Sequence, residues 1–168
     1  MSGLGIQHAS AAPTATDVPA AVSAAGFADA THGAGGALLV YGAASPSLSA
    51  MVVSHSLAGW GGAAVVVGAG SALSLSSCEF TLNNATHGGG AVAAGAGAVV
   101  TSDGGSKLTA NVVLSSTGRG GGVFCAACSF TGSHEALPGA TDVVVRNNEA
   151  WLGGGVFLSQ GSVANVTI

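Results

Sequence analysis

Charged residues are scarce in this chain of 168 residues, which holds three lysines and arginines against seven aspartates and glutamates. The three cations, Lys107, Arg119 and Arg146, are too few to neutralise a row of phosphates, so we expect no nucleic-acid partner. A charged fraction of 6% also argues against a helical repeat protein, because stacked amphipathic helices need many exposed Glu, Lys and Arg side chains.

Long apolar runs are also missing, although the mean hydropathy is +0.60. No formally charged residue lies between Asp29 and Glu79, but Pro46, His55 and repeated glycines interrupt that stretch. A spanning helix needs about 20 consecutive apolar residues, so we expect no transmembrane helix. Residues 1–25 lack a basic segment followed by an apolar one, and they do not resemble a secretory signal.

Aromatic residues make up only 5% of the chain, whereas glycine occurs 29 times. Many of the glycines belong to one motif, Gly-Gly-Ala or Gly-Gly-Val, which opens a short apolar run. Its five copies are Gly35-Gly36-Ala37, Gly61-Gly62-Ala63, Gly89-Gly90-Ala91, Gly121-Gly122-Val123 and Gly154-Gly155-Val156. A motif that returns about every 26 to 33 residues indicates an array of one repeated structural unit.

Each of the later glycine motifs is preceded by two apolar residues that are separated by one other residue. These pairs are Met51/Val53, Phe80/Leu82, Val112/Leu114 and Val143/Val145, and a further pair, Val166/Ile168, ends the chain. Such alternation predicts a half-buried strand. The distance from each pair to the next glycine motif is nearly constant, so we expect the variable connection to follow the glycine-initiated strand. The segments Thr101–Lys107 and Gly132–Pro138 would be inserts in that connection.

Strand, short turn, strand and variable loop, repeated in this order, describe one coil of a parallel β-helix. We expect an all-β solenoid over residues 26–168, with about four complete coils and partial coils at both ends. Residues 1–25 would be a flexible or poorly formed lead-in. No polar cap is visible after Val166, so we expect a truncated array that continues as further coils in a longer protein. Exposed strand edges would make the isolated chain aggregate.

The glycine motif together with Phe80-Thr81-Leu82-Asn83 resembles the GGA(I/L/V) and FxxN repeats of polymorphic outer-membrane proteins, over roughly residues 27–168. The FxxN half is complete only there, and Val144-Val145-Arg146-Asn147 keeps its interval with Val in place of Phe. The resemblance implies a right-handed parallel β-helix of the pectate-lyase-like type. It also implies a place outside the cell or at its surface, a role in adhesion or as a scaffold, and glycans or surface proteins as partners.

Four side chains near the glycine turns are candidates for ligand contact: Trp60, His87, Arg119 and Trp151. Stacked turns would bring them into a row on one edge of the solenoid, and aromatic and arginine side chains suit sugar or protein surfaces. The alternative is that they are exposed turn residues without a shared role.

Two asparagine pairs, Asn83-Asn84 and Asn147-Asn148, fall at the turn after the alternating strand. Asparagine tolerates left-handed backbone conformations and can hydrogen-bond along a stack. We therefore expect Asn83 and Asn147 to belong to a structural asparagine ladder.

Cys125 and Cys128 have the spacing of a redox pair or of half a zinc site. A zinc site needs a second pair of ligands, and only Cys78 remains. A thioredoxin-like site needs a βαβ unit, which this pattern does not contain. We expect either small residues that fill the coil interior or a local disulfide, and no metal or other cofactor.

Pectate lyases and polygalacturonases share the expected architecture, so catalysis has to be considered. Cleavage of an acidic polysaccharide needs clustered carboxylates on one face, usually with Arg or Lys. The seven acids, Asp17, Asp29, Glu79, Asp103, Glu135, Asp142 and Glu149, do not fall at matched positions in adjacent coils. We expect a non-catalytic protein. The alternative is a fragment of a polysaccharide lyase or glycoside hydrolase whose catalytic coils lie outside this chain.

Overall fold

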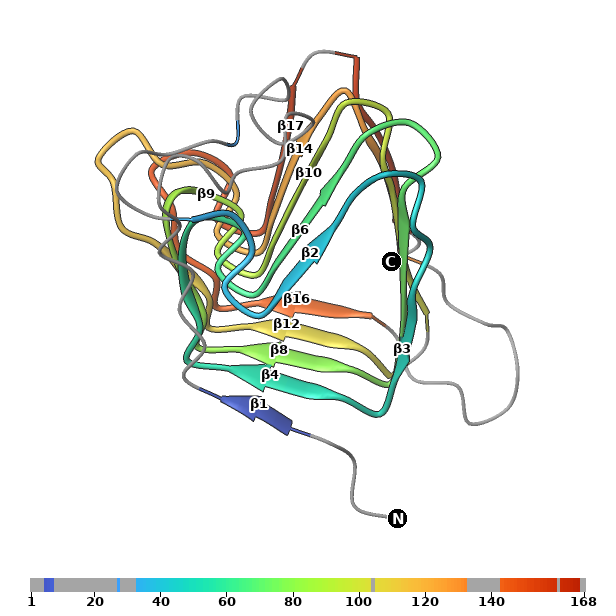
Figure 1. Ribbon diagram of the computed structural model, residues 1–168. Coiled ribbons are helices and arrows are strands. Elements are labelled where there is room, and N and C mark those ends of the chain that lie inside the picture. Colours follow the sequence, from blue (N-terminus) through green and yellow to red (C-terminus); the bar gives the residue numbers. More distant parts are fainter. Residues whose placement is uncertain are drawn as a thin grey trace.

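The computed structural model describes residues 5–7, 27, 33–103, 105–132, 143–159 and 161–166. Within these residues the regular structure consists of β-strands, and the strands pair in parallel across neighbouring coils (Figure 1). The chain is therefore an all-β parallel solenoid, as predicted. No helix in this part of the chain is long and apolar enough to cross a membrane.

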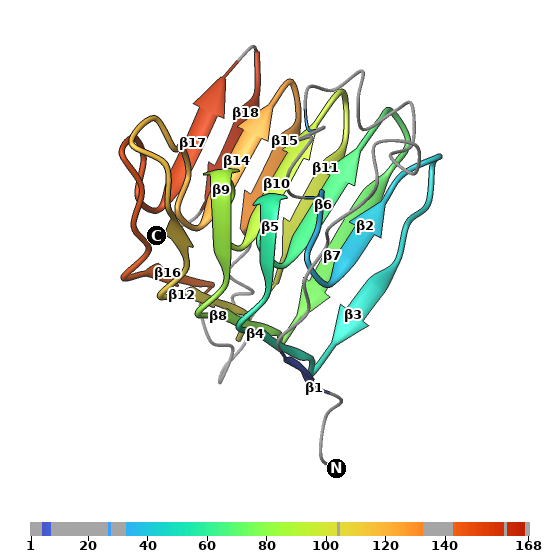
Figure 2. The same ribbon diagram turned by 60° about the vertical axis from the view of Figure 1, so that its left-hand side comes forward.

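Each coil passes through four sheets in a constant order, which we number I to IV from the glycine motif onward. Sheet I contains β2 (Leu38–Val40), β6 (Ala64–Val67), β10 (Val92–Gly95), β14 (Val123–Ala126) and β17 (Val156–Ser159). Sheet II contains β3 (Ser47–Ser49), β7 (Ala72–Ser76), β11 (Val99–Ser102), β15 (Ser129–Gly132) and β18 (Val163–Val166). Figure 2 shows the strands of these two sheets side by side.

The other two sheets complete the coil. Sheet III contains β1 (Gly5–Gln7), β4 (Val52–Ser54), β8 (Glu79–Thr81), β12 (Lys107–Thr109) and β16 (Val144–Arg146). Sheet IV contains β5 (Leu57–Trp60), β9 (Asn84–Gly88) and β13 (Val112–Val113). Isolated bridges at Ala34, Arg119, Glu149 and Leu152 extend sheet IV towards both ends of the stack.

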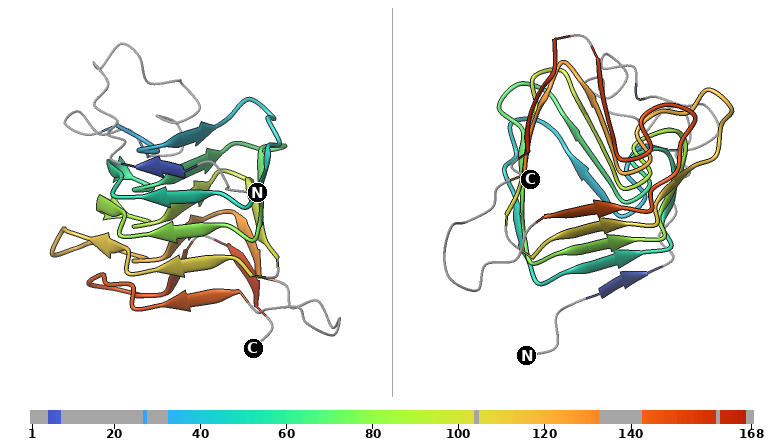
Figure 3. Two further views of the ribbon diagram at one scale, coloured as in Figure 1. Left: turned by 90° about the horizontal axis from the view of Figure 1, so that it is seen from below. Right: turned by 180° about the vertical axis from the view of Figure 1, so that it is seen from behind.

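The described coils stack in chain order (Figure 3). The coils β2–β5, β6–β9 and β10–β13 each contain all four strands. The next coil contains β14, β15 and β16, and bridges at Glu149 and Leu152 take the place of a fourth strand. The strands β17 and β18 begin a further coil. This arrangement is close to the predicted four complete coils with partial coils at both ends.

The sequence pattern predicts two strands in each coil, whereas the structure has four. The unexpected strands belong to sheets II and IV. In β7, Leu73 and Leu75 are buried and alternate with half-buried serines. This is the same two-residue alternation that identifies a strand elsewhere in the chain, but serine lowers its apolar contrast.

Pairing in sheet III corrects two of the predicted alternating pairs. The inward column of this sheet consists of Val53, Phe80, Leu108 and Val145. Leu82 lies in a turn with a φ of 55° and is 45% exposed. Leu114 is 60% exposed, and Val112, the other member of its predicted pair, lies in sheet IV rather than in sheet III. The pairs Phe80/Leu82 and Val112/Leu114 are therefore wrong, because they combine a strand residue with a turn residue.

The connections between sheets differ in length at two corners. The corner from sheet II to sheet III is short between β7 and β8 and longer between β11 and β12. The predicted insert Thr101–Lys107 is too long, because Thr101 and Ser102 belong to β11 and Lys107 belongs to β12. Much of the predicted insert Gly132–Pro138 lies outside the described residues. The corner that was expected to be constant also varies, because residues 114–118 form an extra loop between β13 and the bridge at Arg119.

The glycine turns form two columns at the corner between sheets IV and I, and each column needs glycine for a different reason. The backbone φ is positive in the first column, which consists of Gly35, Gly61, Gly89, Gly120 and Gly153. In the second column, a Cβ on Gly90 would lie against the carbonyl oxygen of Gly121 in the next coil. The motif therefore serves both the conformation of the turn and the close stacking of successive turns.

The last two copies of the motif begin one residue earlier than predicted. Strand pairing places Leu38, Ala64, Val92, Val123 and Val156 in one column. Gly120 and Gly153 therefore correspond to Gly89, whereas the predicted pairs begin at Gly121 and Gly154. A run of three glycines fits both alignments, and the pairing of the following strand decides between them.

The core fills the interior of the coil and continues through the stack. Its largest fully buried side chains include Phe80, Phe130, Leu73 and Leu108, and most of the others are valine, alanine or cysteine. Small side chains suit this position because every coil has to fit inside the same narrow cross-section. At the N-terminal end, β1 pairs with β4 and adds a strand to sheet III, so part of the predicted lead-in 1–25 belongs to the solenoid.

Candidate functional site

The outer face of sheet I is apolar, which is unusual for a surface that could face water. All four residues of β6 and of β10 are buried, although alternate side chains of a strand point to opposite faces. The outward column consists of Leu39, Val65, Ala93, Phe124 and Phe157. These side chains belong to an apolar cluster that is separate from the core inside the coil.

Phe27 covers part of this outer face. It is 1% exposed, and its ring centroid lies 5.2 Å from that of Trp60 and 6.0 Å from that of Phe124. A Cβ on Gly95 would lie 2.9 Å from Cζ of Phe27, so the absence of a side chain at Gly95 makes room for the ring. Phe27 is remote from β10 in the sequence but packs against the outer face of this strand.

The rings on this face form a connected series, and Arg119 contacts one of them. We call this group the aromatic strip; it comprises Phe27, Trp60, His87, Arg119, Phe124 and Phe157. The ring centroid of Trp60 lies 5.5 Å from that of His87 and 5.1 Å from that of Phe124. Phe124 and Phe157 stack at 5.8 Å with an interplanar angle of 3°. The strip therefore crosses several coils along the outside of the solenoid.

Arg119 supplies the positive charge of the strip. Its Cζ lies 5.4 Å from the centroid of the Phe157 ring, within the range of a cation–π interaction. The residue as a whole is exposed, whereas Phe157 is half-buried and Phe124 is buried. The guanidinium can therefore stack on Phe157 and still present N–H donors to a ligand.

The predicted row of Trp60, His87, Arg119 and Trp151 is only partly present as a row. Backbone bridges align Trp60 with Gly88, Gly88 with Arg119, and Arg119 with Leu152. His87 and Trp151 each precede the aligned position by one residue. His87 nevertheless contacts Trp60, whereas Trp151 is 71% exposed beside the strip's C-terminal end.

Three members of the strip, Phe27, Phe124 and Phe157, are not among the candidates for ligand contact that the sequence suggests. Phe124 and Phe157 are each the second residue of a glycine-initiated run, in Val123-Phe124 and Val156-Phe157. Because Val123 points inward, the next residue must point outward, so strand alternation was the signal that could have identified them. The contribution of Phe27 had no local signal.

The asparagine ladder lies at the corner between sheets III and IV, inside the coil. Nδ2 of Asn83 donates to Oδ1 of Asn111 at 3.0 Å, and Nδ2 of Asn111 donates to Oδ1 of Asn148 at 2.9 Å. The backbone nitrogens of Ser56, Asn83 and Asn111 donate to the same row of Oδ1 atoms. The ladder thus stabilises one corner through four coils.

The ladder contains Asn83, as expected, but its last member is Asn148 rather than Asn147. Asn147 precedes it with a φ of 54°, as Leu82 and Ala110 precede their own ladder residues. Asn111 was missed because its strand was assigned to the wrong residues. With the correct register, an inward apolar residue precedes each ladder residue by three positions: Val53/Ser56, Phe80/Asn83, Leu108/Asn111 and Val145/Asn148.

Cys125 and Cys128 form a disulfide across the corner between β14 and β15, with their Cα atoms 5.5 Å apart. Both residues are buried, and Cys78 is a buried free cysteine. Only Ala127 and Cys128 connect these two strands, so the disulfide closes a very short loop. Among the residues that the structure describes, no group of three or more His, Cys, Asp and Glu side chains could hold a metal ion.

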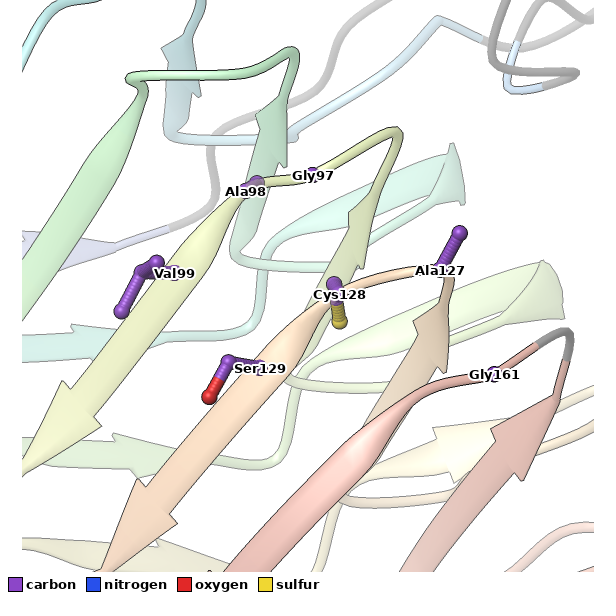
Figure 4. A pocket seen from close by; sticks show the side chains of 7 residues that line it. All are labelled: Gly97, Ala98, Val99, Ala127, Cys128, Ser129 and Gly161. Atoms are coloured by element: carbon purple, nitrogen blue, oxygen red, sulfur yellow. The ribbon is translucent and has the colours of Figure 1, made fainter.

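A shallow hollow of about 290 Å³ lies where the corners between sheets I and II stack (Figure 4). Its lining consists of Gly97, Ala98, Val99, Ala127, Cys128, Ser129 and Gly161. This lining contains no aromatic or charged side chain. The hollow offers a ligand fewer distinctive contacts than the aromatic strip does.

The described carboxylates are spread over different parts of the coil. Glu79 lies in sheet III, Asp103 follows β11 of sheet II, and Glu149 bridges to Val112 in sheet IV. Asp17, Asp29, Glu135 and Asp142 lie outside the described residues. The described part of the chain therefore offers no arrangement to which we assign a catalytic step.

Comparison of the chain with family models, with curated proteins and with solved structures gives no match.

Proposed function

We propose that this chain is a non-catalytic β-solenoid domain that acts outside the cell or at its surface, in adhesion or as a structural scaffold. The observation that carries the proposal is the aromatic strip with Arg119 on the outer face of sheet I. Binding surfaces are enriched in aromatic residues and arginine, which combine a large contact area with few rotatable bonds.

The strip offers a ligand two kinds of contact. The half-buried ring of Phe157, which stacks on the buried ring of Phe124, offers an apolar edge on which the C–H face of a sugar or an apolar side chain can lie. Arg119 and the exposed indole of Trp151 add N–H donors near one end. A glycan or a surface protein is therefore the partner that we propose.

Two further features support this assignment. A Cys125–Cys128 disulfide persists most readily in an oxidising, extracellular environment. In four coils, including those of Phe80 and Leu108, an inward apolar residue is followed three positions later by Asn or Ser. On this basis we propose a relationship to the repeats of polymorphic outer-membrane proteins and a right-handed coil of the pectate-lyase-like type.

The test is binding of the purified chain to a glycan array and to whole cells, with Arg119→Ala as the principal variant. We expect this change to weaken binding about tenfold, because arginine is one of the residue types whose truncation most often costs binding energy at an interface. Arg146→Ala is the matched control, because Arg146 is also exposed but lies in sheet III. Equal losses in both variants would contradict the proposal.

The same preparation separates this proposal from the enzyme alternative. Incubation with acidic and neutral polysaccharides should release no new reducing ends or unsaturated uronates. Turnover that disappears when Glu79, Asp103 or Glu149 is replaced by its amide would favour a carbohydrate-active enzyme instead.

A further inference from the structure

The corner between β14 and β15 is shorter than the corners that stack on either side of it. Ala127 and Cys128 alone connect these two strands, whereas residues 96–98 connect β10 to β11, and the connection from β17 to β18 is equally long. The short corner lies between two longer ones, at the shallow hollow of about 290 Å³ that Cys128 lines (Figure 4). The hollow therefore leads from the surface to the Cys125–Cys128 disulfide.

The two sulfur atoms of this disulfide differ in their access to solvent. Cys125 is 0% exposed and lies in an inward column of sheet I, between Ala94 and Leu158. Cys128 is 6% exposed and belongs to the lining of the hollow. Thiol–disulfide exchange requires direct attack of a thiolate on a sulfur atom, so access decides which sulfur reacts. Sγ of Cys128 is the sulfur atom that an incoming thiol reaches.

Backbone hydrogen bonds hold this corner in place without help from the disulfide. The N–H of Ala127 donates to the carbonyl oxygen of Ser159 at 3.2 Å, and the carbonyl oxygen of Ala127 accepts from the N–H of Gly97 at 2.6 Å. The strands β14 and β15 are also paired on both sides. Since the strands set the distance of 5.5 Å between the two Cα atoms, the cysteines stay together when the disulfide opens.

The spacing of the two cysteines favours a complete reaction cycle. They are three positions apart, which is the Cys-x-x-Cys spacing of disulfide oxidoreductases. A thiol held this close has a high effective concentration towards its partner. When a mixed disulfide forms on Cys128, the thiolate of Cys125 is therefore in position to attack it and to close the protein disulfide again.

The hollow suits a small thiol rather than a protein partner. Its volume of about 290 Å³ is at the lower end of the range of pockets that take small molecules. Gly97, Ala98 and Gly161 in its lining carry no side chain beyond a methyl group. A thiol on a flexible arm can therefore approach Cys128 without displacing a bulky side chain.

We propose that Cys125 and Cys128 form a redox-active pair that exchanges its disulfide with small thiols such as glutathione at this hollow. In the reducing direction a thiolate attacks Sγ of Cys128, the bond between the two protein sulfurs breaks, and Cys125 leaves as a thiolate. A second thiolate attacks the sulfur of the attached small molecule, so that a small-molecule disulfide departs and Cys128 becomes a thiolate. Two electrons thus pass from two small thiols to the protein. The reaction does not depend on ligand binding at the aromatic strip.

The first experiment brings the native chain to equilibrium with mixtures of reduced and oxidised glutathione. Acid stops the exchange, and an alkylating reagent in urea then labels all free thiols for mass spectrometry. The oxidised chain takes up one alkyl group, at Cys78, and the reduced chain takes up three. We expect a reversible transition between these two forms with an unchanged far-UV circular dichroism spectrum. A disulfide that opens only when the chain unfolds would overturn the proposal.

A trapping experiment identifies the sulfur atom that is attacked. Cys125→Ser leaves the thiol of Cys128 without its partner, so oxidised glutathione should attach one glutathionyl group to Cys128 in the native chain. Cys128→Ser is the matched control, because the remaining Cys125 is fully buried and should react several-fold more slowly. Peptide mapping excludes modification of Cys78. Equal rates in the two variants would contradict the role of Cys128.

A third experiment tests the approach through the hollow. Val99 lines the hollow and is 37% exposed, so Val99→Trp should shield Cys128 and slow reduction by glutathione several-fold. Val163→Trp is the matched control, because Val163 shares the outward column of Val99, is 60% exposed and lies outside the lining of the hollow. It should be reduced at the rate of the unmodified chain. Equal rates in both variants would contradict access through this hollow.

Discussion

Asn111 illustrates how much of the fold depends on single buried polar residues. Its Oδ1 accepts hydrogen bonds from the backbone N–H and from Nδ2 of Asn83, both at 3.0 Å. Its Nδ2 donates to the carbonyl oxygen of Phe80 and to Asn148, both at 2.9 Å. Asn111 is 0% exposed, so water cannot replace these contacts. One side chain thus satisfies groups from the two neighbouring coils and links them to its own.

We predict that Asn111→Ala lowers the free energy of unfolding by about 3 kcal/mol, because each buried polar group that loses its partner costs about 1–3 kcal/mol. Urea denaturation followed by far-UV circular dichroism measures this loss. Asn84→Ala is the control, since Asn84 is half-buried on β9 outside the ladder; it should change stability by less than about 1 kcal/mol. Similar losses in the two variants would show that the ladder contributes no specific stability.

At the scale of the structural element, the glycine turn predicts a contrast within one motif. A Cβ on Gly90 would lie against the carbonyl oxygen of Gly121, whereas a Cβ on Gly155 would meet only Cγ1 of Val145 at an ordinary 3.7 Å. Gly155 takes the third position of its copy, where three other copies have alanine. Two glycines that look equivalent in the sequence therefore have opposite tolerance for a methyl group.

We expect Gly90→Ala to destabilise the chain by about 3 kcal/mol or more, because stacked backbones have to separate. Gly155→Ala should be neutral or stabilise by about 0.5–1 kcal/mol, since alanine restricts the unfolded chain more than glycine does. Thermal unfolding of both variants under identical conditions checks the two signs. A stable Gly90→Ala variant would refute the proposed close stacking of the turns.

The corner between β14 and β15 carries a further prediction at this scale. The disulfide Cys125–Cys128 closes a loop of only four residues, so the entropy model gives it a contribution of about 2 kcal/mol. Reduction should therefore lower the urea midpoint of the unmodified chain. A Cys125→Ala/Cys128→Ala variant should unfold at a lower urea concentration and should not respond to reductant. A reductant effect that persists in this variant would have to come from Cys78.

At the scale of the whole molecule, the recurrence of the glycine motif was sufficient to predict a parallel solenoid. Repetition at about 30 residues without helical periodicity leaves few other architectures. The register was harder to predict, because three consecutive glycines at Gly120 and at Gly153 permit two alignments. The expected ladder residue Asn147 was wrong for a separate reason, because the FxxN interval placed Val144 at the position of Phe80, whereas strand pairing places Val145 there and Asn148 in the ladder.

The candidate site was only partly predictable for a different reason. Trp60, His87 and Arg119 could be selected because they lie next to the glycine turns. The position of Phe27 over Gly95 depends on the path of a segment that is remote in sequence from β10, and no local pattern reports such a contact. For Phe124 and Phe157 the local pattern was misleading, because an aromatic residue in an apolar run directly after an inward valine looks like part of the core.

The extra loop at residues 114–118 shows how such a molecule can change without refolding. Gly88 and Arg119 still form a bridge, and β13 still pairs with β9, although the third coil has a longer connection at this corner. Surface loops that leave and rejoin an intact ladder tolerate insertions well. The solenoid can therefore serve as a display scaffold, in which the corner after β13 accepts a foreign peptide while the asparagine ladder and the glycine columns keep the coils in place.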